Sequence, residues 1–475
     1  MKLTNPLLFA FFTLVAGSAL FSSAPLAQVI IALVPVVAVM LLWPPGGLPI
    51  LLMPLTIQWF QVATKPISAA LQGVPLSTLS DRGATLEPGF LAASAALMAL
   101  AIGLRIGVGR SVASLGSAFR HDLRTIGERD LYRIMAACFA VSYIAEFLSN
   151  YAGGARQLLL GAANLKLAVI FLMVAWTIVC QRGRMLAISV ISIEVILGMT
   201  GFFAEYRQTL IVTLFAFLAA APRVSGKMLL NVFVLGVVTL LLSVFWSSVK
   251  PGYREFVNWG SGAQIVDRPL SERLNYLADA AEKFDGVQFE DGLKRLVDRV
   301  SYIEFLSFAL DGAQYSGNHG GEQTFNALLH ILVPRLIYPD KPPLPNDTAV
   351  TARYTGLGFQ PGDATSISLG YVGELFADFG WTGMLIASLI LGAIIGLACR
   401  LLLLYQGGSL AMNVSLAILP LSAVLMFETA LIKIVGGMVT SLVAALLLQR
   451  MILPRLLRVA SVASPRRPHR ALSQR

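Results

Sequence analysis

Segments of mostly apolar residues, each long enough to cross a bilayer, recur along most of the chain. They are interrupted by one long polar stretch, residues 250–380. Apolar residues make up 56% of the 475 residues and charged residues only 13%, against about 25% charged in a soluble domain. Together with a mean hydropathy of +0.73, this pattern predicts an all-α polytopic membrane protein.

A membrane helix needs about 17–25 mostly apolar residues, and this criterion predicts about twelve spans. They are 6–22, 26–43, 47–64, 88–107, 131–149, 157–180, 185–203, 208–222, 228–248, 380–403, 409–427 and 430–452. The break at Pro44-Pro45-Gly46-Gly47 leaves a re-entrant pair open as an alternative. The first segment is long for a cleaved signal peptide, so an uncleaved anchor is favoured over cleavage near Ala27.

Basic residues lie mainly in the short connectors, whereas the long polar stretch is acidic. It holds 11 Lys/Arg and 17 Asp/Glu, a net charge of −6, although the whole chain carries +10. The positive-inside rule therefore assigns the basic connectors and both termini to the cytoplasm and the polar stretch to the opposite face. This rule explains the net positive charge of the chain without a nucleic-acid partner. The connector and tail residues concerned are Arg105, Arg110, Arg120, Arg124, Arg129, Arg133, Arg182, Arg184, Arg223, Lys227, Arg450, Arg455, Arg458, Arg466, Arg467, Arg470 and Arg475.

Four regions follow from this topology. Residues 1–249 form an N-terminal transmembrane bundle of about nine spans, and residues 250–379 form a large external loop. Residues 380–452 hold the last three spans, and residues 453–475 form a basic tail that lies near anionic lipid.

The external loop is predicted to be partly helical. Hydrophobic periodicity predicts helices over 271–284, 289–310 and 323–332, and a further helix over 366–379 that runs into the tenth span. On this last helix Glu374 and Asp378 share a face.

A proline-rich segment, 334–343, follows the third loop helix. Proline fixes φ and disfavours the helical region for the residue before it, so this stretch is expected to be extended and stiff. It would hold Arg335 and Lys341 in a preset geometry. The alternative for both residues is a structural ion pair with Asp340.

No nucleotide, nucleophile-elbow or zinc-protease motif is present. The three cysteines lie in or beside apolar segments, and the four histidines have no helical ligand spacing, so we predict no metal site and no cofactor. What remains is a set of arginines and carboxylates on the external side.

Several basic residues are candidates for binding an anion. Arg207 begins the eighth span, Arg254 follows the ninth, and Arg353 lies late in the loop. Their structural alternatives are a snorkelling arginine paired with Glu205 for Arg207, and an ordinary interfacial charge for Arg254. Because guanidinium groups bind phosphates in a bidentate manner, these residues suit a lipid-linked diphosphate.

Two further residues are candidates for acid–base chemistry. Glu374 lies close to the expected membrane surface and is a candidate general base, with a helix cap or an ion pair as the alternative. His319, in a glycine-rich stretch, is a candidate proton shuttle, with a solvated loop residue as the alternative.

Two motifs and one arginine make the chain resemble the bacterial O-antigen and exopolysaccharide repeat-unit polymerases, the Wzy-like family. The first motif is the Pro-Arg-Leu-Ile-Tyr-Pro-Asp-Lys-Pro sequence at 334–342. The second is Gly-Glu-Leu-Phe-Ala-Asp-Phe-Gly-Trp-Thr-Gly at 373–383. Arg207 opens a span before the large loop, as in that family. Arg254 and Arg353 lack the glycine eleven residues on that some members carry.

The resemblance implies a GT-C-like bundle with a periplasmic loop in the bacterial inner membrane. It implies a metal-independent inverting glycosyltransferase whose donor is an undecaprenyl-diphosphate-linked oligosaccharide. Arg207, Arg335 and Arg353 would hold the diphosphate or an acidic sugar, with Arg254 and Lys341 as further ligands, and Glu374 or His319 would assist the acceptor hydroxyl. Membrane lipids, a chain-length regulator and a flippase are the expected partners.

Three other functions remain open. An O-antigen ligase, which transfers finished polymer to lipid A core, would show the same loop and arginines. A transporter or flippase would place charged residues deep within spans, and Glu146, Lys166, Glu194, Glu428 and Lys433 are the candidates. A scaffold in a polysaccharide export complex would tolerate loss of the loop arginines.

Overall fold

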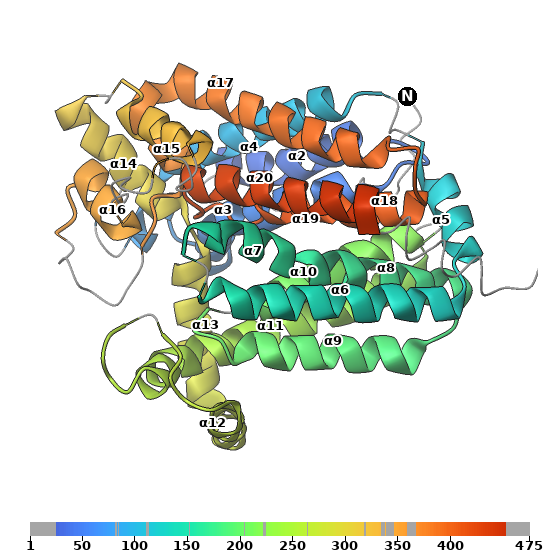
Figure 1. Cartoon of the computed structure of the whole chain (residues 1–475). Coiled ribbons are helices and arrows are strands. Elements are labelled where there is room, and N and C mark those ends of the chain that lie inside the picture. Colours follow the sequence, from blue (N-terminus) through green and yellow to red (C-terminus); the bar gives the residue numbers. More distant parts are fainter. Residues whose placement is uncertain are drawn as a thin grey trace, which may run out of the picture.

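The computed structural model describes residues 25–80, 83, 85–110, 114–151, 153–203, 205–221, 225–263, 265–317, 320–333, 338, 346–358 and 367–452. Within these ranges the chain is helical and contains no β-strand, which confirms the all-α prediction. Most long helices run roughly along one direction as a bundle, and shorter helices gather at its two ends (Figure 1).

Six described segments are long and apolar enough to cross a membrane. They match six of the predicted spans, and they are α4 (Leu86–Val108), α6 (Glu128–Ser149), the pair α7 (Arg156–Ala163) and α8 (Leu165–Cys180), α11 (Gly226–Val257), α17 (Gly370–Leu403) and α20 (Leu431–Leu447).

Five other predicted spans fall on shorter or less apolar helices. Three of these are apolar helices of 10–17 residues, in α2 (Pro25–Leu42), α10 (Tyr206–Ala220) and the pair α18 (Leu410–Leu416) and α19 (Ile418–Ser422). The predicted span 47–64 falls on the short 3-10 helix η1 (Pro49–Leu51) and α3 (Leu52–Gln72), and 185–203 falls on α9 (Arg184–Met199). The span 6–22 lies outside the described residues, so the twelve-span count stays a prediction.

One end of the bundle collects the basic connectors, and we call it the basic end. The short helix α5 (Gly116–Thr125) joins these connectors: Gly116 N donates to Gly46 O at 2.9 Å. The Asp122 carboxylate accepts from Ser409 Oγ at 2.6 Å and from Ala411 N at 2.7 Å. The turn at 44–47, the connector that contains α5 and the start of α18 therefore meet at one end.

The opposite end, the loop end, carries the helices of the polar stretch (Figure 1). These helices are α12 (Leu270–Glu282), α13 (Gly286–Val300), α14 (Ile303–Ser316), α15 (Glu322–Leu332) and α16 (Asp347–Thr355). The predicted helix 289–310 is divided, because Tyr302 N leaves the helical pattern and donates to Gln61 O of α3 at 3.2 Å. The ninth span also continues as a helix to Val257, past its predicted end at 248.

Helices α4 and α17 approach each other through glycines. An added Cβ on Gly103 would lie 2.0 Å from Leu389 O, and one on Gly392 would lie 2.3 Å from Leu100 O. Gly107 and Gly396, each four residues further on, are equally tight, at 2.1 and 2.5 Å from backbone oxygens. This is the spacing of small residues by which membrane helices bring their backbones into contact.

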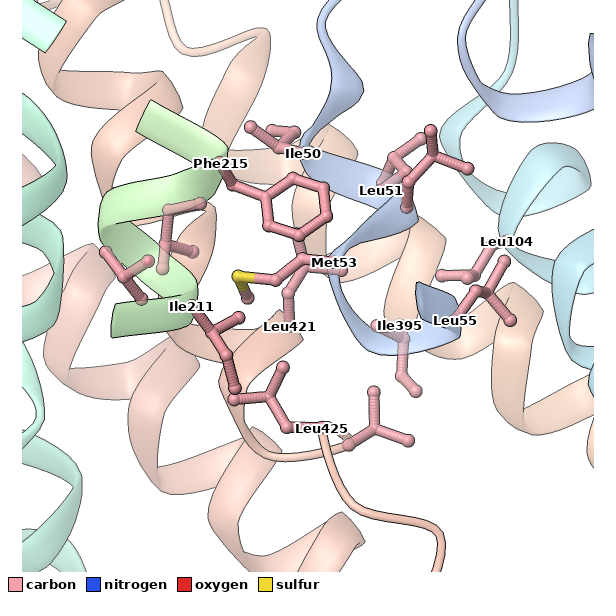
Figure 2. Packing of buried hydrophobic residues seen from close by; sticks show 14 of the residues in the cluster. Ile50, Leu51, Met53, Leu55, Leu104, Ile211, Phe215, Ile395, Leu421 and Leu425 are labelled. Carbon is pink, nitrogen blue, oxygen red and sulfur yellow. The ribbon is translucent and has the colours of Figure 1, made fainter. Parts of the chain in front are cut away.

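The apolar core lies in the middle of the bundle, around Met53 (Figure 2). Met53 has no exposed surface and packs with Phe215 of α10 and Leu421 of α19. Residues far apart in the chain thus share one core. The bundle therefore gives the loop-end helices a rigid base.

Candidate functional site

Arg207 lies in the first turn of α10, at the loop end. Its neighbour Tyr206 is fully buried and packs edge-on against Trp246 of α11, with ring centroids 6.5 Å apart. The Arg207 Nε and Nη2 atoms are buried and have no hydrogen-bond partner among the described residues. Glu205 is not that partner, since its carboxylate lies 3.9 Å from Lys166. An unsatisfied buried guanidinium is costly, so this position favours an anionic ligand.

A pocket of about 470 Å³ opens beside the loop end of α11. We call it the basic pocket, because four of its side chains are cationic. Its lining residues are Phe202, Ser247, Lys250, Pro251, Arg254, Glu255, Asn258, Gly260, Gly262, Arg295 and Arg299.

Close packing of α13 on α11 builds this pocket. An added Cβ on Gly292 would lie 2.6 Å from Val244 O, so the two helix backbones approach closely there. Arg295 and Arg299 follow Gly292 by three and seven residues and so share its face of α13. The same contact therefore sets both arginines against α11.

Arg254 is held in place by the turn between α9 and α10. Its Nε donates to Phe202 O at 3.3 Å, and its guanidinium lies 4.3 Å from the centre of the Phe202 ring. Tyr253 Oη and Arg273 Nη1 both donate to Thr200 O, at 2.6 and 2.7 Å. These bonds pin the α9–α10 turn to α11 and α12, so the Arg254 side chain is preorganised.

The cations of the pocket act on one another. Lys250 interacts electrostatically with Arg299, Arg254 and Arg207. Partial burial, together with Arg207 and Arg254, lowers the pKa of Arg299 to about 10, so the group is still charged at neutral pH. Because the guanidinium groups of Arg207, Arg254 and Arg299 repel one another in a partly desolvated space, a bound anion would stabilise this arrangement.

Glu255 lines the pocket itself, and a second carboxylate, Glu428, interacts with two of its basic residues. These two residues are Lys250 and Arg299, and the interaction is electrostatic. Glu428 lies in the non-helical segment 423–430 between α19 and α20, in which no residue is exposed. Gln61 of α3 holds the segment: its Nε2 donates to Glu428 Oε2, and its Oε1 accepts from Phe427 N at 2.7 Å.

Glu374 and Asp378 have structural partners on other elements. Glu374 is 5% exposed, and its Oε2 accepts from Leu431 N at 2.9 Å, at the start of α20. Asp378 is 1% exposed and accepts from Thr324 N at 2.7 Å, in the first turn of α15. Both carboxylates therefore cap other helices, which is the structural alternative considered for Glu374. A role for Glu374 as general base stays a prediction.

Arg353 does not line the basic pocket. Arg353 of α16 forms an ion pair with Glu322 of α15 at 2.9 Å, with both side chains about half exposed, and this bond raises the pKa of Arg353 above its ordinary value. His319, Arg335 and Lys341 lie outside the described residues, so their predicted roles are untested.

Three of the charged residues considered for a transport function lie together. Lys166 of α8 is 3.6 Å from Glu146 and 4.0 Å from Glu194, and Tyr143 Oη donates to Glu194. Such mutual compensation is one way in which a membrane protein accommodates intramembrane charge. Across the described ranges, no group of three His, Cys, Asp or Glu side chains is arranged to hold a metal ion.

The chain matches no protein-family model, no curated protein and no solved structure. The site therefore has to be interpreted from its own geometry. Sequence reasoning selected Arg207 and Arg254 but missed Lys250, Arg295 and Arg299. The available signal was the pattern Gly292, Arg295, Arg299 on one face of an amphipathic helix.

Proposed function

We propose that this protein polymerises undecaprenyl-diphosphate-linked oligosaccharide repeat units into O-antigen or exopolysaccharide. It acts at the periplasmic face of the bacterial inner membrane as a metal-independent inverting glycosyltransferase. The observation that carries the proposal is the basic pocket, together with Arg207, which interacts electrostatically with Lys250 and Arg299 and whose buried Nε and Nη2 have no hydrogen-bond partner among the described residues. No cofactor enters the reaction.

The pocket suits a diphosphate leaving group. Arginine binds phosphate oxygens through two parallel N–H bonds, and Arg254, Arg295 and Arg299 all line the cavity. Charge develops on the diphosphate as the glycosidic bond breaks. Preorganised cations stabilise that charge without reorganising, which contributes several kcal/mol in enzyme sites.

The surroundings of the pocket suit a lipid carrier. Helix α11 carries Lys250 and Arg254 at its loop end, and its apolar face is largely uncovered along the rest of its length: Phe233 and Val234 are 67% and 52% exposed. A polyprenyl chain would lie against this face while its diphosphate enters the pocket. A soluble nucleotide sugar would not need an exposed apolar helix face beside its binding pocket.

The charge distribution supports the orientation. The basic connectors lie at one end of the bundle and the acidic loop at the other. Basic connectors are retained in the cytoplasm, so the pocket would face the periplasm. There the protein would receive its donor from a flippase, and a chain-length regulator would control the product.

Lipid-linked glycan profiling tests the proposal. A deletion strain would be complemented with wild type, Arg299→Ala or Arg207→Ala. We expect single repeat units to accumulate in both variants, because loss of one charge-stabilising donor slows such reactions about 10²–10³-fold. Lys294→Ala is the matched control on the same helix, since Lys294 is 69% exposed and pairs only with Glu290 in the described structure.

Each alternative function has its own outcome. Accumulation of long lipid-linked polymer in the deletion strain would indicate a ligase. Absence of repeat units from the outer face would indicate a flippase. Normal polymer in the deletion strain, or in both arginine variants at normal abundance, would refute the polymerase function proposed for the basic pocket.

A further inference from the structure

Trp259, just beyond the end of α11, has a backbone conformation that a large side chain rarely adopts. Its φ is +56°, in the left-handed region, where a bulky residue is an outlier. Such strain persists only where the surrounding structure holds the residue in place, and it is concentrated at functional sites. Glycine would adopt the same conformation without strain, so the strain here accompanies the presence of an indole ring.

Hydrogen bonds on both sides of Trp259 hold it in this conformation. Gly260 N donates to Glu255 O at 2.9 Å and to Asn258 Oδ1 at 3.0 Å. Asn258 is 4% exposed, and its Nδ2 donates to Ala263 O at 2.8 Å. Asn258 and Gly260, the chain neighbours of Trp259, both line the basic pocket. Trp259 is therefore fixed at the rim of that pocket.

Arg268 supports the indole ring from one side. Its guanidinium lies 3.4 Å from the centre of the Trp259 ring and 4.1 Å from the centre of the Phe256 ring. Arg268 is itself fixed, because its Nε donates to Phe256 O at 2.8 Å and its Nη1 donates to Glu272 Oε2 at 2.9 Å. Trp259 is nevertheless 64% exposed, so the ring face turned away from Arg268 is open. The result is a preorganised aromatic surface beside a cavity lined by basic side chains.

Membrane anchoring does not explain this arrangement. Tryptophan is common at membrane surfaces, but the ninth predicted span ends at 248 and α11 continues to Val257. At about 1.5 Å per residue, Trp259 lies roughly 15 Å beyond the end of that span. Phe202 lines the pocket as well, but it is only 5% exposed and its ring is covered by Arg254. Trp259, unlike Phe202, therefore presents an open ring face to a ligand.

We propose that the open face of Trp259 binds the sugar that is joined to the diphosphate of the lipid-linked substrate. This assignment rests on the proposed function. The C–H groups on one side of a pyranose ring form an apolar surface, which packs on the electron-rich face of an indole ring. The sugar is bonded directly to the diphosphate, so a diphosphate held by the basic side chains leaves the sugar near the rim of the pocket. The site thus recognises the phosphate by charge and the saccharide by stacking.

Binding to purified full-length protein in lipid nanodiscs tests this role. The two probes are a polyprenyl diphosphate and the same lipid carrying one N-acetylglucosamine residue. We expect wild type to bind the glycosylated probe about tenfold more tightly. Trp259→Ala should bind both probes equally, with its Kd for the sugar-free probe within about threefold of wild type. Trp381→Ala is the matched control, because Trp381 is 45% exposed and lies outside the basic pocket.

Trp259→Gly separates the loss of stacking from misfolding. Glycine relieves the strain at the positive φ, so this variant should unfold at no lower a detergent fraction than wild type. We expect it to lose the preference for the glycosylated probe as Trp259→Ala does. A folded protein that no longer distinguishes the two probes would assign the preference to the indole ring itself.

The outcomes distinguish this role from the proposed function. Normal polymer in the deletion strain would refute polymerisation, whereas the preference for the sugar is measured without turnover. Equal binding of the two probes by wild type, or an unchanged preference in both Trp259 variants, would overturn the role of Trp259. So would a loss of preference in Phe203→Ala in place of Trp259→Ala, since Phe203 is 52% exposed and lies 5.7 Å from the Arg254 guanidinium. Binding of uridine diphosphate that depends on Trp259 would show that the ring stacks on a base, and it would overturn the saccharide assignment.

Discussion

A methyl group placed on Gly103 should separate the two most closely packed helices of the bundle. The ideal Cβ of an alanine there would lie 2.0 Å from Leu389 O and 2.8 Å from Ala393 N, both of them backbone atoms of α17. Ordinary van der Waals contact begins at 3.4 Å. The backbones of α4 and α17 would therefore have to move apart locally by about 1.4 Å.

The loss of stability expected for Gly103→Ala follows from the packing that α4 and α17 lose. Backbone atoms cannot rotate away as a side chain does, so the whole interface near Gly103 must open. Overpacking of a well-packed core costs about 1–3 kcal/mol, and the backbone contact places this variant at about 3 kcal/mol. Lipid tails are as apolar as the buried side chains, so no hydrophobic gain compensates for the packing lost between the two helices.

Reversible unfolding in mixed micelles would measure this cost. Gly236→Ala is the control, because Gly236 lies inside helix α11, is exposed, and has nothing within 4 Å of an added Cβ. There alanine should stabilise the helix by about 0.5–1 kcal/mol through its higher helix propensity. We therefore expect the free energies of unfolding of the two variants to differ by about 3–4 kcal/mol.

One result would contradict this reasoning directly. If Gly103→Ala unfolds at the same detergent fraction as Gly236→Ala, the two backbones do not touch at Gly103. The contacts of Gly107, Gly392 and Gly396 would then be in doubt as well, because all four glycines belong to the same helix pair.

Two further predictions concern buried charges. Lys65→Met leaves Glu304 without the ammonium group that lies 2.6 Å from its carboxylate, and we expect a loss of about 3–5 kcal/mol in the free energy of unfolding. The double variant Lys65→Met with Glu304→Leu should recover most of this loss. Equal stability of the single and the double variant would argue against a buried pair. Asp378→Ala removes the acceptor for Thr324 N and should lower the stability of α15 by about 1 kcal/mol. Hydrogen exchange would show this as faster amide exchange in α15 with unchanged exchange in α20. Equally faster exchange in both helices would mean that Asp378 supports more than a helix end.

Hydropathy was sufficient to predict the helical class and six of the spans. Six predicted spans coincide with six described helices, because a run of apolar residues of membrane length has few other stable conformations. The basic connector that contains α5 lies at the same end as Gly46 and Ser409, whereas the membrane orientation stays a prediction. The break at Ser301–Tyr302 was missed, since it depends on a bond to Gln61 O, 241 residues away in the chain.

The candidate site was predicted only in part. Arg207 and Arg254 were selected because they lie at span ends, and both belong to the same group of cations. Arg353, selected as a further basic residue late in the loop, pairs with Glu322. Local sequence cannot separate these cases, because an arginine at a helix end has the same neighbours in the chain whether its guanidinium meets a carboxylate or an empty pocket.

The sequence by itself determined that this chain is helical, that six of its described segments are long and apolar enough to cross a membrane, and that a long acidic stretch separates two of them. These properties depend on composition and spacing along the chain. Only the tertiary structure brought together Arg207, Lys250, Arg299 and Glu428, because four separate elements have to pack before their charges interact. Helical periodicity determines on which face of its own helix a residue lies. The close approach of α13 to α11 at Gly292 determines which faces of these two helices contact each other.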